Sequence, residues 1–337
     1  MWVPKMVHFE EKALHYERGQ RMLERFKELN VPVAVMGKGN RVSGLEGETP
    51  LEMLAASKRT LAVRVRNTKS FETCKPSAHY QLPLASSCPG KCEYCYLYTN
   101  LGKKPYLRTY VNVEEILARA EEYIKERLPE TTVFEGAATS DPIPMEPFSG
   151  ALADTITFFG RQEYGRFRFV TKFTQVDELL KITHNQHTRF RFSVNSDRVI
   201  KAWEHGTPRL EERLQAAVKV AGADYPLGLI IAPVLLEDGW QEEYRTLFER
   251  IAEGLHSYEE ITLEIILHRF TTRAKSNIYE LFPNSTLPMD EEERRFKYGQ
   301  FGYGKYVYPK EIYAEAEAFF LAKIKEYLPK AEVEYLV

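Results

Sequence analysis

The central part of the chain alternates short apolar runs with longer amphipathic stretches. The apolar runs predict strands at 81–85, 132–136, 166–171, 189–194, 227–233 and 261–266. Helices are predicted between them, one beginning after Asn112 and the others near 150–160, 175–184, 208–221 and 240–254. Asn112 is expected to cap its helix, with Glu115 returning the hydrogen bond. Because crossovers between parallel strands are right-handed, this alternation predicts an α/β fold built on a parallel sheet.

The N-terminal part of the chain follows a different pattern. Residues 10–29 carry apolar side chains at helical spacing among many charges, and residues 51–57 have the same character. A short strand is predicted at 61–65. Residues 1–75 are therefore predicted to form a mainly helical extension.

The alternation of strands and helices stops after about residue 267. Residues 297–308 combine aromatic side chains with regularly placed glycines, which predicts a β-hairpin, and a terminal helix is predicted at 310–327. The resulting division is an N-terminal extension (1–75), an alternating α/β region (76–270) and a C-terminal hairpin and helix (271–337).

The composition of the chain indicates which classes of protein and which compartment it fits. The 337 residues are 44% hydrophobic and can bury a large core, and their net charge of −2 argues against indiscriminate binding to nucleic acid, although a local basic groove remains compatible with it. No run approaches the ~18 apolar residues of a membrane span, and no secretory signal is expected. Three of the four cysteines lie within eight residues, which suits a reducing cytoplasm better than a disulfide framework.

The densest chemical signal is the cysteine run Cys88, Cys92 and Cys95, spaced C-x3-C-x2-C. Three thiolates on one loop can hold three irons of a [4Fe–4S] cluster and leave the fourth iron open to a ligand that is not protein. The alternative is a zinc loop, in which Cys74 or a histidine would supply the fourth ligand. The single C-x2-C pair favours the cluster.

An aromatic residue, Tyr94, directly precedes the last of these cysteines, and the pattern resembles the radical S-adenosylmethionine (SAM) enzymes. The resemblance implies a [4Fe–4S] cluster and SAM as cofactors, with reductive cleavage of SAM to a 5′-deoxyadenosyl radical. It also implies a partial (β/α)6 TIM-like barrel, which agrees with the predicted strands.

A more specific resemblance extends from about residue 70 to the C-terminus. The matching segments are 75–78, 81–84, the cysteine loop, 134–135, 139–141, 166–172, 188–193, 268–271 and 304–308. Together they resemble spore photoproduct lyase. The resemblance implies a DNA-repair lyase that reverses 5-thyminyl-5,6-dihydrothymine to two thymines, through hydrogen abstraction at C6, β-scission and return of hydrogen from a thiol.

The resemblance also assigns roles to individual residues. Cys88, Cys92 and Cys95 would bind the cluster. The SAM site would be lined by Ser140, Lys172, Ser193 and Ala232, and each of these is alone no more than a common strand-end or core residue. Tyr94 and Tyr96 would take part in returning the hydrogen atom to SAM.

One departure from the family pattern concerns the hydrogen donor. The family usually carries a cysteine where this chain has Ala138. Cys74 is the only cysteine left once the cluster has its three ligands, so we expect it to be the donor, although it could be a buried small apolar residue instead. Some clostridial members resemble this chain in having alanine here and a cysteine upstream.

The implied partner is ultraviolet-damaged DNA whose thymine lesion is flipped into the site. Arg269, Lys305 and Tyr306 are the candidate substrate contacts, whereas Gln300 and Phe301 replace the Arg-Tyr pair that family members tend to have. The resemblance further implies an electron donor such as flavodoxin or ferredoxin, no membrane partner, and the cytoplasm of an endospore-forming bacterium, in the spore core or germinating spore. The alternatives are radical chemistry on RNA or a peptide, and a non-enzymatic, zinc-dependent nucleic-acid-binding protein.

Overall fold

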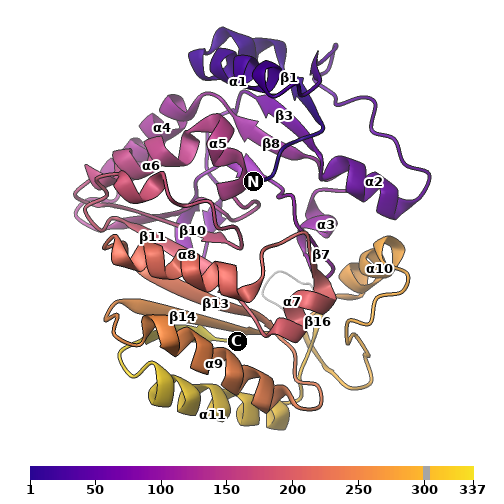
Figure 1. Ribbon diagram of the computed structural model, residues 1–337, viewed down its shortest axis with the longest axis vertical. Helices are drawn as coiled ribbons and strands as arrows, with labels where there is room; N and C mark the ends of the chain where they lie inside the picture. Colours follow the sequence, from indigo (N-terminus) through magenta and orange to yellow (C-terminus); the bar gives the residue numbers. More distant parts are fainter. Residues whose placement is uncertain (299–303) are drawn as a thin grey trace.

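The larger of two main sheets is a curled half-barrel of eight strands. The structure is a computed structural model that describes residues 1–298 and 304–337 (Figure 1). The sheet order is β17-β14-β13-β11-β10-β9-β5-β4, and neighbouring strands are parallel except β4 and β5. The strands are β4 (Thr73–Cys74), β5 (Ala78–Gln81), β9 (Thr132–Glu135), β10 (Gly165–Thr171), β11 (Thr188–Val194), β13 (Leu227–Val234), β14 (Ile261–Leu267) and β17 (Glu332–Leu336). The predicted partial barrel is therefore confirmed.

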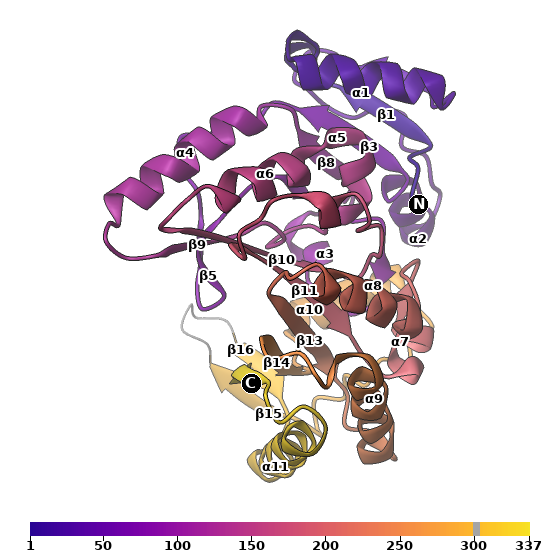
Figure 2. The same cartoon turned by 60° about the vertical axis from the view of Figure 1, so that its left-hand side comes forward.

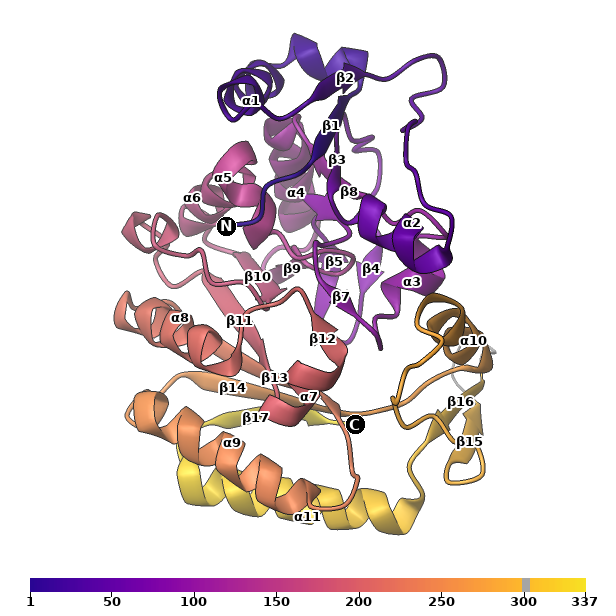
Figure 3. The same ribbon diagram turned by 45° about the vertical axis from the view of Figure 1, so that its right-hand side comes forward.

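The outer face of the half-barrel is apolar because alternate side chains of each strand point to it. Phe134, Phe167, Phe169 and Phe190 belong to one buried core with the covering helices. These helices are α4 (Val113–Glu126), α6 (Ala151–Gly160), α8 (Leu210–Gly222), α9 (Trp240–Leu255) and α11 (Lys310–Tyr327). Figure 3 shows α8, α9 and α11 following one another along the outside of the sheet. The helix predicted at 175–184 is wrong, since that stretch contains only the short 3-10 turn Leu179–Lys181.

The inner face of the half-barrel is charged. Arg191 pairs with Glu135 and Glu264, and Arg168 lies 2.5 Å from Glu264. These side chains are nearly inaccessible to solvent, so each charge is compensated by a partner rather than by water. Gly228 faces Arg191 across β11 and β13, where a Cβ would lie 2.7 Å from Arg191 Cγ. The glycine thus makes room for the arginine stem.

The N-terminal residues form a second sheet, whereas the sequence predicted a mainly helical extension with one short strand at 61–65, which is β3 (Thr60–Arg64). The order of this sheet is β2 (Val33–Val35), β1 (Met6–Phe9), β3, β8 (Leu107–Tyr110) and β6 (Ala85–Ser86). Helices α1 (Glu17–Glu28) and α2 (Pro50–Ser57) accompany it, and Figure 2 shows α1 and this sheet at one end of the molecule. The strands are too short to produce a clear alternation, which is why the sequence did not reveal the sheet.

The first predicted strand, 81–85, is divided between the two sheets. Strand β5 ends at Gln81, whereas Ala85 begins β6 and pairs with Thr109 of β8. The two sheets consequently share the segment that leads into the cysteine loop. The N-terminal sheet therefore includes β6 and β8 from beyond residue 75, and the division at residue 75 stays a prediction.

The C-terminal region contains the predicted hairpin and helix. Strands β15 (Arg295–Tyr298) and β16 (Gly304–Val307) pair antiparallel, after α10 (Thr272–Leu281), and α11 has the predicted bounds. Strand β17 then returns to the edge of the half-barrel beside β14. Gln300 and Phe301 lie outside the described residues. Among the described residues, no helix combines the length and hydropathy needed to cross a membrane.

Candidate active site

The cysteine loop follows β6 and is held at the mouth of the half-barrel by a two-stranded pairing. Strand β7 (Lys91–Cys92) pairs antiparallel with β12 (Glu204–His205), which places Cys92 opposite Glu204. A Cβ added to Gly90 would lie 3.6 Å from Cys88 Sγ and 3.9 Å from Cys92 Sγ. Glycine at this position therefore keeps open the space that the two thiols face.

The three thiols are electrostatic neighbours. Burial raises the pKa of Cys88 to about 11, and Cys95 is among the groups that raise it further. Burial also raises the pKa of Cys92, with Glu204, Cys95 and Cys88 adding to the effect. Adjacent buried thiolates require a nearby positive charge. This donor set fits an iron–sulfur cluster, whose irons would supply that charge.

Lys58 binds the start of the same cysteine loop. Its Nζ donates hydrogen bonds to Ser87 Oγ at 3.0 Å and to the Cys88 carbonyl at 2.9 Å. The Lys58 side chain is buried, and its charge lowers the pKa of Cys88 against the effect of burial. Sequence analysis did not single out Lys58, because a lone lysine thirty residues upstream carries no recognisable signal.

The zinc alternative requires side chains that converge on one ion. Within residues 1–298 and 304–337, no group of three or more Cys, His, Asp and Glu side chains gathers closely enough to hold a single metal ion. A cube differs in this respect, because its three cysteine sulfurs bind three different irons and lie further apart.

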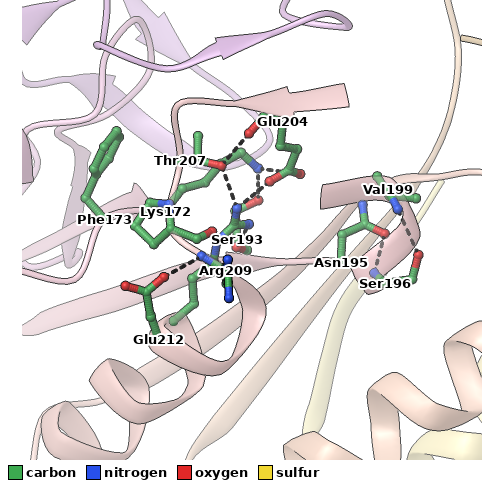
Figure 4. Close-up of polar contacts among 12 residues, drawn as sticks. Lys172, Phe173, Ser193, Asn195, Ser196, Val199, Glu204, Thr207, Arg209 and Glu212 are labelled. Carbon is green, nitrogen blue, oxygen red and sulfur yellow. Dashed lines mark hydrogen bonds and ion pairs between the residues drawn. The ribbon is translucent and has the colours of Figure 1, made fainter. Parts of the chain in front are cut away.

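The residues expected to bind SAM meet at the carboxyl ends of the strands. Lys172 Nζ donates to Ser193 Oγ at 2.6 Å and lies 3.2 Å from Glu204 Oε1 (Figure 4). Ser140 pairs with Ser87 beside the cysteine loop, and Ala232 lines the cavity at the mouth. The four predicted positions therefore surround the same end of the half-barrel.

Asp141 fixes the segment that carries Ser140. Its carboxylate accepts hydrogen bonds from the Lys172 backbone N–H at 2.8 Å and from Thr171 Oγ1 at 2.8 Å. Burial raises its pKa to about 6, although these hydrogen bonds oppose the shift. The carboxylate thus connects the loop after β9 to the end of β10.

Glu204 joins three side chains at this site, and no sequence pattern pointed to it. Its buried carboxylate accepts hydrogen bonds from Tyr94 Oη, Lys172 Nζ and Arg213 Nη2, the last at 2.5 Å. Burial alone would raise the pKa of Glu204, but Lys172 and Arg213 lower it below its usual range. Glu204 is therefore ionised and holds a tyrosine, a lysine and an arginine together.

The two candidate tyrosines point to different partners. Tyr94 Oη contacts Glu204, whereas Tyr96 Oη donates a 2.5 Å hydrogen bond to the Ala138 carbonyl. Tyr96 is 58% exposed, so this tyrosine is accessible from the mouth. Burial of the phenol oxygens raises the pKa of both, which keeps each O–H protonated at neutral pH.

Cys74 lies on β4, at the edge of the half-barrel, and is half-buried. Burial raises the pKa of its thiol, while the inward-facing Arg191 and Arg168 oppose this shift. Cys74 is also among the groups that raise the pKa of Tyr96. The thiol is thus influenced by the charges inside the barrel and in turn influences the tyrosine that contacts Ala138.

A cavity of about 540 Å³ opens at the mouth. Its walls include Tyr94, Cys95 and Tyr96 on one side and Arg269 and Lys305 on the other. Tyr306 packs on Phe270, with ring centroids 5.3 Å apart, and the two backbones are hydrogen-bonded to each other. The structure therefore brings Arg269 and Lys305 to the cavity, whereas Tyr306 supports its wall.

Comparison with known sequences gives one consistent family. The profile of the family described as spore photoproduct lyase matches residues 2–337. The spore photoproduct lyase of Clostridium acetobutylicum is 47% identical over 333 residues, covering 99% of this chain and 98% of the relative. That of Bacillus subtilis is 45% identical over 336 residues, with the same coverage.

Solved structures agree with these relatives. A spore photoproduct lyase complexed with dinucleoside spore photoproduct superposes with a TM-score of 0.96 at 45% identity, covering 100% of this chain and 99% of the other. A double mutant of spore photoproduct lyase with bound AdoMet and the same dinucleoside matches equally well. In that mutant a serine is replaced by cysteine and a later cysteine by alanine, and the two positions are as far apart as Cys74 and Ala138. This chain belongs to the spore photoproduct lyase family.

Proposed function

We propose that this chain repairs DNA by reversing the spore photoproduct to two thymines. The observation that carries the proposal is that the cysteine loop and the Lys172–Ser193 pair meet at one mouth, where Glu204 pairs with Cys92 and lies 3.2 Å from Lys172 Nζ. Relatives that are 45–47% identical over nearly their full length bear the name spore photoproduct lyase, which supports the same activity.

The cofactors would occupy the residues already described. Cys88, Cys92 and Cys95 would hold a [4Fe–4S] cluster, and SAM would lie across Ser140, Lys172, Ser193 and Ala232. When bound, this pair supplies the 5′-deoxyadenosyl radical that removes hydrogen from C6 of the lesion. Lys172 would neutralise the SAM carboxylate, and Glu204 keeps the lysine oriented before SAM arrives.

Hydrogen return would depend on residues of this chain. After the methylene bridge breaks, the Cys74 S–H would give a hydrogen atom to the thymine radical and become a thiyl radical. Tyr96, whose pKa is sensitive to Cys74, would then give its O–H hydrogen atom to the thiyl radical. Tyr94 would take part in passing the radical back, restoring SAM. The transfers from Cys74 and Tyr96 each move one hydrogen atom; restoring SAM would also remake its carbon–sulfur bond and return one electron to the cluster.

DNA would approach over the same mouth. Arg269 and Lys305 line the cavity and would hold backbone phosphates, since both carry positive charge there. Tyr306 would contribute by packing on Phe270 and so supporting the wall of the cavity. A flavodoxin or ferredoxin would supply the electron for the cluster, in the spore core or in the cytoplasm of a germinating spore.

The decisive experiment is anaerobic reconstitution with iron and sulfide, followed by addition of SAM, dithionite and the dinucleoside spore photoproduct. Release of thymidine from the lesion together with turnover of SAM is the expected result. Formation of 5′-deoxyadenosine without repair would point to an RNA or peptide substrate. A colourless protein that binds one zinc and forms no 5′-deoxyadenosine would support the non-enzymatic alternative instead.

A further inference from the structure

A second cavity, of about 370 Å³, lies beside the active-site mouth. Tyr96 lines the mouth and Ala138 lines the second cavity, and their hydrogen bond joins the two walls. In the same way, Asn100 lines the mouth and Leu101 lines the second cavity. The two spaces are therefore neighbours, separated by a thin wall that includes the Tyr96–Ala138 contact.

The second cavity is lined by three arginines, which the N-terminal sheet places there by its register. Leu61 pairs with Leu107 across β3 and β8, whereas Ala62 pairs with Arg108. Leu61 and Leu107 belong to the core that contains the buried side of α1. Because alternate residues face opposite sides, Arg108 and Arg64 point away from that core and line the cavity.

Arg66 follows Arg64 by two residues and reaches the same cavity. Its backbone is fixed by the fully buried Asn112, whose side-chain oxygen accepts from Arg66 N–H at 2.8 Å and whose amide donates to the Arg66 carbonyl at 2.9 Å. Asn112 is the N-cap residue of α4, as predicted, but its side chain makes no capping hydrogen bond. It donates instead to Glu115 Oε2 at 2.8 Å and joins the start of α4 to the segment after β3. The position of Arg66 is thus built into the fold.

The positive charge of this cavity is only partly compensated. Arg64 Nε lies 3.5 Å from Glu10 Oε2, but within the described part of the chain neither Arg66 nor Arg108 forms an ion pair. Arg108 Nη1 donates to Ser86 Oγ at 3.2 Å, and its guanidinium stacks 4.3 Å from the ring centre of Tyr106. Glu72 is the single carboxylate in the lining. The cavity consequently presents guanidinium donors without a matching number of acceptors.

We propose that this arginine cavity binds a backbone phosphate of the lesion-bearing DNA strand, next to the flipped lesion. The inference rests on the proposed repair function. Guanidinium groups bind phosphate through paired N–H donors. Here the guanidinium of Arg108 lies over the ring of Tyr106 and that of Arg66 over the ring of Tyr110, 5.7 Å from its centre, while Asn112 fixes the Arg66 backbone. A strand whose lesion lies in the mouth has its neighbouring phosphate within one nucleotide of the Tyr96–Ala138 wall. The cavity would therefore fix the register of the strand relative to the cofactor.

The test compares substrates with and without backbone phosphates. The double variant Arg66→Gln/Arg108→Gln is compared with wild-type in binding a fluorescent, lesion-containing oligonucleotide, and the phosphate-free dinucleoside is used as a competitor. Arg21→Gln serves as the matched control, since Arg21 is exposed on α1 and lies on the other side of the N-terminal sheet. Arg108→Lys keeps the charge but removes the paired donors.

The double variant is expected to bind the oligonucleotide about tenfold more weakly, and the dependence of log K on log salt is expected to fall by roughly 1–2. The loss for the oligonucleotide should exceed that for the dinucleoside at least about fivefold, because only the former carries phosphates. Arg108→Lys should weaken binding but keep most of the salt dependence. An equal loss of affinity for the oligonucleotide and the dinucleoside, or an unchanged salt dependence of oligonucleotide binding, would overturn the proposal. Failure of wild-type to repair the dinucleoside would instead count against the repair function.

Discussion

The phenol of Tyr96 donates a 2.5 Å hydrogen bond to the backbone carbonyl of Ala138. The side chain of residue 138 is a methyl group, which can return no hydrogen atom. Cys74 is among the groups that raise the pKa of Tyr96. We therefore expect Tyr96 to exchange hydrogen with Cys74 rather than with residue 138.

Replacing Cys74 by alanine should uncouple SAM cleavage from clean repair. The cluster and the SAM site do not include Cys74, so 5′-deoxyadenosine should still form, whereas the thymine radical should be diverted to other products. The yield of thymidine per SAM consumed is the measurement, and a fall of at least about tenfold is expected.

The double variant Cys74→Ala/Ala138→Cys provides the control for this prediction. If hydrogen return needs a thiol on either side of the Tyr96 contact, moving it to residue 138 should restore most of the repair. Unchanged repair by Cys74→Ala alone would remove Cys74 from the mechanism.

Glu204→Gln should destabilise the fold and weaken SAM binding. The substitution leaves the fully buried Arg213 and the mostly buried Lys172 without a counter-charge, at a cost of roughly 3 kcal/mol. Urea denaturation measures the change in stability, and equilibrium binding of SAM measures the change in affinity. Glu253→Gln, at an exposed position on α9, is the matched control and should change neither. A fully stable Glu204→Gln variant would contradict the proposed role of this charge.

Gly90→Ala should lower cluster content without unfolding the chain. The added Cβ would lie 3.1 Å from Thr207 Cγ2 and would enter the space that Cys88 and Cys92 face. Iron and sulfide per chain after anaerobic reconstitution are the measurements, with circular dichroism as the test of folding. Gly37→Ala is the control, because a Cβ there meets nothing within 4 Å. Wild-type iron content in Gly90→Ala would show that this space is not needed.

His268 should make the protein less stable in mild acid. Its ring is buried, and burial together with Arg294 lowers its pKa from 6.5 to about 3, so the folded state keeps it neutral. Between these values the unfolded chain binds the extra proton, and stability is therefore lost as pH falls from 6.5 towards 3.

His268→Phe removes this proton but keeps an aromatic ring beside Phe270. The difference in unfolding free energy between wild-type and variant should shift by about 2 kcal/mol between pH 8 and pH 5, in favour of the variant at the lower pH. If the unfolding free energies of the two proteins vary with pH in parallel, His268 takes up its proton in the folded state as readily as in the unfolded chain, and the prediction is wrong.

The central strands and helices could be predicted because their signals are local. The alternation of phenylalanine with arginine in 166–169 reflects one buried apolar face and one charged inner face, and α11 begins and ends where its pattern does. Of the short strands in the N-terminal sheet only β3 was predicted; β1 and β2 carry no clear signal, since three or four residues fit several conformations equally well. Their pairing is decided by neighbours far along the chain.

By itself, the sequence determined the cysteine spacing, most strands of the barrel core and the family, because these depend on residues close together or on motifs read in order. Only the tertiary structure decided that Glu204 lies between Tyr94, Lys172 and Arg213, and that Arg64, Arg66 and Arg108 line one cavity. Those relationships join residues up to 110 positions apart. They arise from sheet register and burial, which bring distant charges together only when the whole fold has formed.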